Sequence, residues 1–294
     1  MKKFGHLITA MITPFHQDGS VDYEGAASLA RYLTDHGSDG ILVGATTGEG
    51  ATMSAEEKLK LYETIVHAVG DRVLVVGNTG GVDTAASAAF TKQAEKTGID
   101  AVLAIVPYYV KPTQEGIYRH FKTIAEATSL PVILYTVPGR TSSNIVPATV
   151  KRLAEACPNI VGIKEASGNW DQISEERRIL PENFMIYSGD DSFSLPILAL
   201  GGQGIISVAS HVIGEELRSM VEACHAGDFR RAAKLHLHLY PMMKGLFFIT
   251  SPIPVKTAVN LMGLPGGAFR LPMVEPSGEE TAFIKKLMKE YHLI

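Results

Sequence analysis

The sequence predicts an α/β protein, a (β/α)8 TIM barrel whose eight parallel strands alternate with helices, followed by a C-terminal helical appendage. Short runs rich in Val, Ile and Leu alternate with longer segments of helical periodicity. Most of these runs are apolar on both faces, as expected for parallel strands that helices cover. Eight such units, each a strand followed by a helix, favour a closed barrel over an open sheet.

The predicted elements follow one another at intervals of roughly 20 to 33 residues. Strands are expected at residues 7–12, 40–43, 73–76, 101–106, 132–135, 160–164, 185–187 and 204–207. The clearest helices are expected at residues 24–36, 55–69, 84–97, 114–127 and 147–156. Start signals support several of them: Ser54 precedes Glu56 and Glu57, Asp83 precedes an alanine-rich stretch, and Pro147 occupies a first turn.

The remaining chain carries no strand signal. We therefore expect the barrel to occupy residues 1–224 and a C-terminal helical region to occupy residues 225–294. Helices are expected in that region at residues 229–248, 254–262 and 279–291, with a Pro- and Gly-rich loop at 264–276.

The composition excludes several classes of protein. The chain has 294 residues, of which 46% are hydrophobic and 20% charged, enough for a large core. A formal net charge of −4 argues against a nucleic-acid partner, and no apolar run is long enough to span a membrane. The run after Lys3 is interrupted by His6 and Thr9, which favours a core strand over a signal peptide. Two cysteines, Cys157 and Cys224, lack metal-ligand spacing and predict a reducing, cytoplasmic location.

Lys164 is the most informative polar residue. It closes the predicted strand 160–164, and a barrel builds its active site at the C-terminal ends of the strands. Burial there would lower the pKa of its amine from the usual value of about 10.4. A neutral amine can attack a ketone and form a Schiff base. The alternative is a structural lysine paired with Glu165 or Glu49.

Other strand ends carry groups that suit this chemistry. The hydroxyls of Tyr135 and Thr47 could relay the protons that imine formation requires. The residues at 46–48 could hold a small carboxylate through hydroxyl and amide groups. Arg140, in a turn after the fifth strand, could bind a second carboxylate through two parallel hydrogen bonds. We thus expect one substrate to be a keto acid bound to Lys164 and the other an anion.

These residues lie in motifs that resemble the 4-hydroxy-tetrahydrodipicolinate synthase (dihydrodipicolinate synthase) family. This family belongs to the pyruvate-dependent class I aldolase superfamily, which includes N-acetylneuraminate lyase. The resemblance runs over essentially the whole chain. It rests on Gly-Ala-Thr-Thr-Gly-Glu at 44–49, Pro-Tyr-Tyr at 107–109, Tyr-Thr-Val-Pro-Gly-Arg-Thr at 135–141, Gly-Ile-Lys-Glu-Ala-Ser at 162–167, Ser-Gly-Asp-Asp at 188–191 and Pro-Ile-Pro-Val-Lys at 252–256.

The resemblance implies a lyase that condenses pyruvate with L-aspartate 4-semialdehyde at the entry to the diaminopimelate route to lysine. It implies no metal, no organic cofactor, and a homotetramer built as a dimer of dimers. It also implies roles for particular residues. Lys164 would be the Schiff-base lysine, and Thr47, Tyr135 and Tyr109 would form a proton relay, with Tyr109 supplied by a neighbouring subunit. The pyruvate site would contain Thr46, Thr47, Gly189 and the Ile206 backbone, and Arg140 would bind the semialdehyde carboxylate.

The chain departs from the family pattern at several positions. Thr136, Val110 and Ser251 stand where the family commonly has asparagine. The resemblance places a feedback site for L-lysine beside Tyr108. The matching positions there are Ala55, Lys58, Val82 and Ala86. Val82 and Ala86 cannot bind the polar groups of the amino acid, and Lys58 would repel its side chain. We therefore expect the protein to be insensitive to L-lysine.

Two other functions remain open from the sequence. A related lyase or aldolase could cleave a 2-keto-3-deoxy sugar acid through the same imine, and Arg140 is the residue that argues against it. A non-catalytic sensor could instead bind a keto acid. Such a sensor would not need Lys164 together with the hydroxyls of Tyr135 and Thr47.

Overall fold

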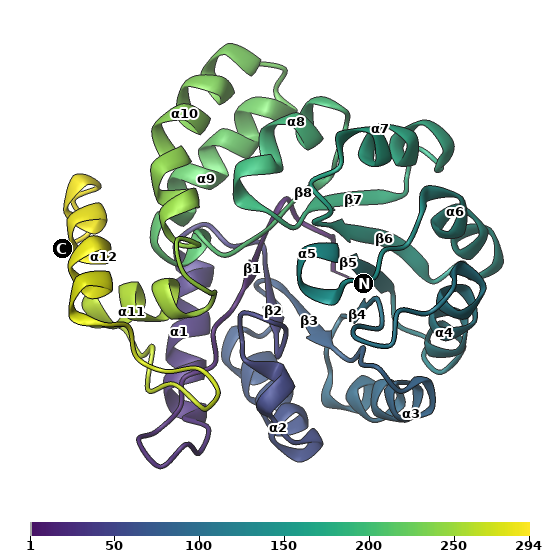
Figure 1. Ribbon diagram of the computed structural model, residues 1–294, viewed down its shortest axis with the longest axis horizontal. Helices are drawn as coiled ribbons and strands as arrows, with labels where there is room; N and C mark the ends of the chain where they lie inside the picture. The colour runs from purple at the N-terminus through teal and green to yellow at the C-terminus, as the bar shows by residue number, and fades with distance from the viewer. Residues whose placement is uncertain (1) are drawn as a thin grey trace.

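The computed structural model describes residues 2–294, and in these residues eight parallel strands form a closed barrel (Figure 1). Each strand pairs with the next in the sequence, and the ring closes where Leu7 pairs with Ile205. The strands are β1 (Leu7–Ala10), β2 (Gly40–Val43), β3 (Leu74–Asn78), β4 (Ala101–Ile105), β5 (Val132–Thr136), β6 (Ile160–Glu165), β7 (Met185–Ser188) and β8 (Gly204–Ser207). The predicted barrel is confirmed.

Helices surround the barrel and connect its strands (Figure 1). They are α1 (Tyr23–Asp35), α2 (Ala55–Val69), α3 (Thr84–Ala94), α4 (Gln114–Glu126), α5 (Pro138–Thr141), α6 (Pro147–Ala156), α7 (Trp170–Ile179), α8 (Ser194–Ala199) and α9 (Ser210–His225). The predicted start signals act as caps. Ser54 and Glu57 form a capping box on α2, and Asp83 accepts a hydrogen bond from the backbone N–H of Ala86.

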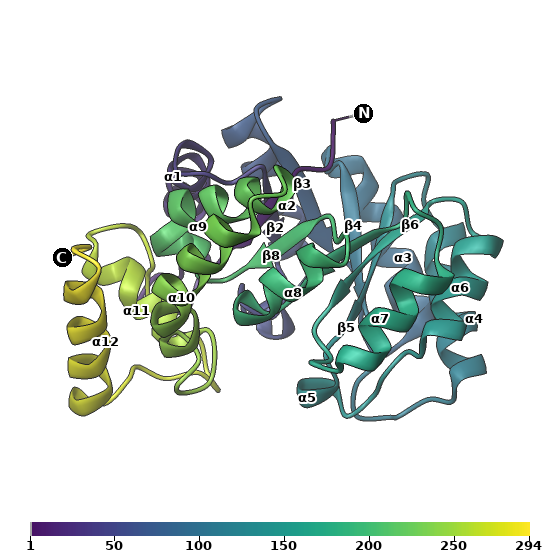
Figure 2. The ribbon, with the colours of Figure 1, turned by 90° about the horizontal axis from the view of Figure 1, so that it is seen from above.

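The C-terminal part contains α10 (Phe229–Gly245), α11 (Ile253–Leu261) and α12 (Gly278–Glu290), which lie together at one side of the barrel (Figure 2). Helix α9 ends at His225, one residue past the expected limit of the barrel. The division into residues 1–224 and 225–294 stays a prediction. None of the helices within residues 2–294 is both long and apolar enough to cross a membrane.

Several element ends differ from the predicted ones, and two of these differences have a clear local reason. Strand β1 ends at Ala10 and does not continue to Ile12, because the Ile12 N–H donates to Nε2 of His211 and leaves the sheet. Helix α3 ends at Ala94 and passes into a 3-10 turn, where the Thr97 hydroxyl donates to the Ala94 carbonyl.

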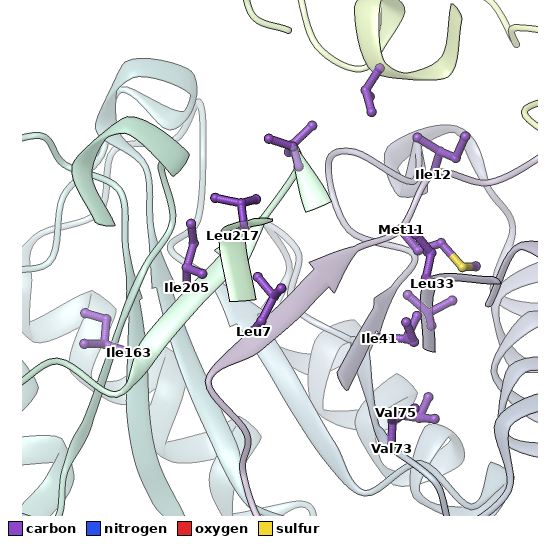
Figure 3. Close-up of a cluster of buried hydrophobic side chains, with 14 of the residues drawn as sticks. Leu7, Met11, Ile12, Leu33, Ile41, Val73, Val75, Ile163, Ile205 and Leu217 are labelled. Carbon is purple, nitrogen blue, oxygen red and sulfur yellow. The ribbon is translucent and has the colours of Figure 1, made fainter. Parts of the chain in front are cut away.

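The core has two layers because strand side chains alternate between the two faces of the barrel. Leu7, Ile163 and Ile205 face the helices and join the outer layer, part of which is shown in Figure 3. The inner layer fills the barrel with side chains that include Ile8, Leu42, Leu103, Ile133 and Ile206. This alternation decides which strand residues can reach a site inside the barrel.

Candidate active site

Lys164 reaches the inside of the barrel near the C-terminal end of β6. Its side chain follows the outward-facing Ile163 and is only 5% exposed. The Lys164 Nζ lies 4.4 Å from the centre of the Tyr135 ring, and the two residues are register partners across β5 and β6. Burial lowers the pKa of the amine to about 8, with Asp191 raising it and Arg140 lowering it further. Near neutral pH, far more of this amine is uncharged than the roughly one in a thousand of a free lysine.

The alternative of a structural ion pair at Lys164 is wrong for both suggested partners. Glu49 is paired with Lys256, whose Nζ lies 2.7 Å from its Oε1. Glu165 is the outward neighbour of Lys164 on β6, and its Oε2 accepts a hydrogen bond from Gln172 on α7. The lysine amine is therefore left available for chemistry.

Tyr135 lies beside the amine at the end of β5 and is also 5% exposed. Burial raises the pKa of its hydroxyl to about 12, while the Arg140 charge and the Thr46 side chain lower it. The hydroxyl therefore stays protonated near neutral pH and can donate a proton. Thr46 thus lies near the Tyr135 hydroxyl, while the part of Thr47 in the proton relay stays a prediction. Thr47 is buried in the same loop.

The loop that carries both threonines has little room to move. The Thr13 hydroxyl donates to the Gly48 carbonyl at 2.7 Å. A Cβ on Gly50 would lie 1.8 Å from the Gly44 carbonyl oxygen, so only glycine fits there. Glu49 adopts a left-handed backbone with φ of 52°. These contacts hold residues 46–48 in one conformation at the barrel mouth.

Gly189 lies directly against the reactive lysine. A Cβ at this position would lie 3.0 Å from the Lys164 Cε and 2.8 Å from the Ala166 Cβ. Any larger residue would push the lysine side chain aside. Ile206, the other backbone candidate, belongs to β8 and its side chain joins the inner layer of the barrel.

Asp191 is a buried carboxyl group that the reasoning about strand ends did not single out. Asp190 does cap, since its side chain accepts from the Ser192 N–H. Asp191 is buried and accepts from the backbone N–H groups of Val208 and Ala209, both at 3.1 Å. Burial raises the pKa of its carboxyl to about 6, and its charge favours the ammonium form of Lys164.

Arg140 lies in α5 and is exposed, as expected for a residue that meets an incoming substrate. Its charge influences both Lys164 and Tyr135. Helix α5 lies at the end of the barrel opposite to the N-terminus, next to the ends of the strands (Figure 2). The turn that carries Arg140 is thus at the C-terminal end of the barrel.

Tyr109 lies in the loop after β4, and its backbone N–H donates to the Thr141 carbonyl at the end of α5. Its side chain is 88% exposed and its backbone has a φ of 68°, a conformation that costs energy in a tyrosine. Among the positions that depart from the family pattern, Val110 is exposed beside it, while Thr136 is fully buried on β5 and Ser251 is buried in the C-terminal part. Thr136 follows Tyr135, so its side chain faces away from the barrel interior.

Two substitutions should move the pH dependence of imine formation in opposite directions. Arg140→Gln removes a charge that lowers the pKa of Lys164, so the rate curve should shift to higher pH. Asp191→Asn removes a charge that raises it, so the curve should shift to lower pH. The measurement is the rate of cyanoborohydride trapping of pyruvate on Lys164 as a function of pH. Shifts of both rate curves in the same direction would contradict the opposite effects of Arg140 and Asp191 on the pKa of Lys164.

Within residues 2–294, no group of three or more His, Cys, Asp and Glu side chains is arranged to hold a metal ion.

Comparison with known proteins identifies the family. The model of the dihydrodipicolinate synthetase family matches residues 3–291. A 4-hydroxy-tetrahydrodipicolinate synthase from Desulforamulus reducens is 53% identical over 99% of this chain and 98% of its own. A crystal structure of dihydrodipicolinate synthase from Cyanidioschyzon merolae with lysine bound superimposes with a TM-score of 0.97 at 42% identity, over 100% of both chains. That of Aquifex aeolicus gives 0.96 at 44% identity, over 99% of both. These matches confirm the predicted fold and the predicted class of enzyme, a lyase, and the chain belongs to the dihydrodipicolinate synthetase family.

Proposed function

We propose that the protein condenses pyruvate with L-aspartate 4-semialdehyde to give 4-hydroxy-tetrahydrodipicolinate, through a Schiff base on Lys164. One observation carries this proposal: a buried lysine amine with a pKa of about 8 lies beside the Tyr135 ring at the mouth of the barrel. Relatives that are about 50% identical over the full length of the chain are named 4-hydroxy-tetrahydrodipicolinate synthase, which supports the same reaction. Such a biosynthetic reaction fits a cytoplasmic location.

The proposed reaction begins when the neutral Nζ of Lys164 attacks the keto carbon of pyruvate. The addition product loses water, and a protonated imine results. Loss of a methyl proton then converts the imine into an enamine, whose carbon attacks the aldehyde of the second substrate and forms the new C–C bond. The amino group of the semialdehyde then attacks the imine carbon and closes the ring, which breaks the bond to Nζ and releases Lys164 as the free amine. Tyr135 donates and recovers protons during these steps. Thr46 is the next group in the relay, because its side chain interacts with Tyr135.

The substrate carboxylates require separate partners. We assign the pyruvate carboxylate to Thr46, Thr47 and the neighbouring amides, with the Gly189 and Ile206 backbones at the edge of the same subsite. We assign the carboxylate of the semialdehyde to Arg140, whose guanidinium offers two parallel donors.

The direct test is borohydride reduction in the presence of pyruvate, followed by intact mass and peptide mapping. A single pyruvyl adduct on Lys164 is expected. Lys256, the other buried lysine of the site region, serves as the internal control and should stay unmodified, because its Nζ is held by Glu49 and by the Thr13 carbonyl. Adducts on Lys256, or none at all, would contradict the proposal. A substrate panel then separates condensation with the semialdehyde from cleavage of a 2-keto-3-deoxy sugar acid.

We further propose a homotetramer, a dimer of dimers in which Tyr109 completes the relay of a neighbouring subunit. The exposed side chain and the strained backbone of Tyr109 support this. Mixing two weakly active variants, Tyr109→Phe and Lys164→Met, should restore activity, because some mixed sites regain both groups. The activity of each variant alone is the control. Failure of a refolded mixture to exceed the sum of its parts would refute the exchange of Tyr109.

We expect no inhibition by L-lysine, although the relative from Cyanidioschyzon merolae was solved with lysine bound. Lys58 lies in α2 with its Nζ 5.6 Å from the centre of the Phe90 ring, and its charge would repel the ammonium of the ligand side chain. Val82 and Ala86 offer no polar side-chain group to bind it. Initial rates measured over a range of L-lysine concentrations provide the test, and inhibition below one millimolar would disprove the prediction.

A further inference from the structure

A chain of buried polar side chains lies behind the two strands that carry the reactive groups. Tyr135 pairs in register with Lys164, and the next residues along the same strands, Thr136 and Glu165, pair with each other. Because side chains alternate along a strand, the first pair faces the barrel interior and the second faces the helices. Whatever connects Thr136 to Glu165 therefore sets the relative position of Tyr135 and Lys164.

Three hydrogen bonds make that connection. The Thr136 hydroxyl donates to the Asn144 Oδ1 at 2.8 Å. The Asn144 Nδ2 donates to the Gln172 Oε1 at 2.7 Å, and the Gln172 Nε2 donates to the Glu165 Oε2 at 3.1 Å. Thr136, Glu165 and Gln172 are buried, so water cannot easily replace a lost partner. Thr136 is one of the departures from the family pattern, and its hydroxyl begins this chain.

Glu176 extends the chain on α7. It is fully buried, and the Gln172 Nε2 lies 3.4 Å from its Oε1. Burial raises the pKa of both Glu165 and Glu176, and the proximity of the two carboxyl groups raises that of Glu176 further. Burial and this proximity both favour the neutral form of the Glu176 carboxyl group. Within residues 2–294 the Glu176 Oε2 has no hydrogen-bond partner, so the network ends at this carboxyl group.

We propose that Thr136 and Gln172 are positioning residues, which lock the ends of β5 and β6 together so that Tyr135 stays aligned with Lys164 for proton transfer. Neither residue touches the substrates, and this inference rests on the proposed Schiff-base function. Proton transfer and covalent attack demand placement to within about 0.5 Å, and an error of about 1 Å can cost about a hundredfold in rate.

The experiment compares variants matched in shape. Thr136→Val removes only the hydroxyl. Gln172→Met removes the hydrogen bonds of the side-chain amide to Asn144 and Glu165 while keeping the side-chain length. Each should lower kcat by about 10- to 100-fold, with little change in the KM for pyruvate. Thr136→Ser keeps the hydroxyl and should recover most of the lost kcat. The pH profile of kcat should also change in Thr136→Val, because it reports the alignment of the Tyr135 hydroxyl with the amine.

The matched control is Thr91→Val in α3. Thr91 is equally buried, and its hydroxyl lies 2.8 Å from both the Thr79 Oγ1 and the Ser87 carbonyl oxygen, neither of which belongs to the network between Thr136 and Glu165. It should lose stability while kcat stays unchanged. Unchanged kcat in both Thr136→Val and Gln172→Met, or an equal loss in Thr91→Val, would overturn the proposal. The absence of a pyruvyl adduct on wild-type Lys164 would instead reject the proposed function, so the two failures are distinguishable.

Discussion

Replacing Lys164 with methionine should lower kcat by more than about 10⁴-fold, because the thioether cannot form an imine and the reaction loses its electron sink. The fold should be kept. Methionine has a similar length and an apolar end that suits a site only 5% exposed. Removing an amine whose burial lowers its pKa also removes a desolvation cost, so the free energy of unfolding should stay the same or rise.

The measurements are steady-state turnover and denaturant unfolding of the same preparation. Lys60→Met is the matched control, since Lys60 is an exposed lysine stacked over the Tyr23 ring 4.2 Å away, outside the barrel. It should retain full activity. Full turnover in Lys164→Met would remove the basis for the proposed mechanism.

Replacing Lys256 with methionine should lower the free energy of unfolding by about 3 to 5 kcal/mol. The Lys256 and Glu49 side chains are 0% and 1% exposed and form an ion pair at 2.7 Å. The Lys256 Nζ also donates to the Thr13 carbonyl at 2.9 Å. Without this lysine, the Glu49 carboxylate is buried with the Arg270 backbone N–H, at 3.3 Å, as its remaining hydrogen-bond donor.

The same change should disturb the active site. Glu49 follows residues 46–48 directly, and its left-handed backbone depends on the partners of its carboxylate. We therefore expect a loss of kcat together with stability. Adding Glu49→Gln to Lys256→Met removes the unpaired charge and should return part of the lost stability. A loss below about 1 kcal/mol in the single variant would show that the pair behaves like a surface ion pair.

Lys256 also bears on the division of the chain. It belongs to α11, in the predicted C-terminal region, yet it is buried against a loop of the barrel. We expect residues 1–224 and 225–294 to unfold in a single transition for this reason. Matching unfolding midpoints from tryptophan fluorescence and circular dichroism would support one cooperative unit.

The sequence by itself determined the fold class, because apolar runs and helical periodicity are local properties of the chain. It also singled out Lys164 as a candidate for catalysis, since most lysines are solvated on polar surfaces and this one ends an apolar strand. Tyr135 and Arg140 followed from the same rule about strand ends.

The tertiary structure alone decided the partners of these residues. Glu49 and Lys256 are 207 residues apart, and no local pattern couples them. The role of Asp191 depends on the backbone amides of the loop after β8, which only barrel closure brings near. Such contacts arise from register and packing between segments that are distant in the sequence, so a local sequence pattern cannot predict them.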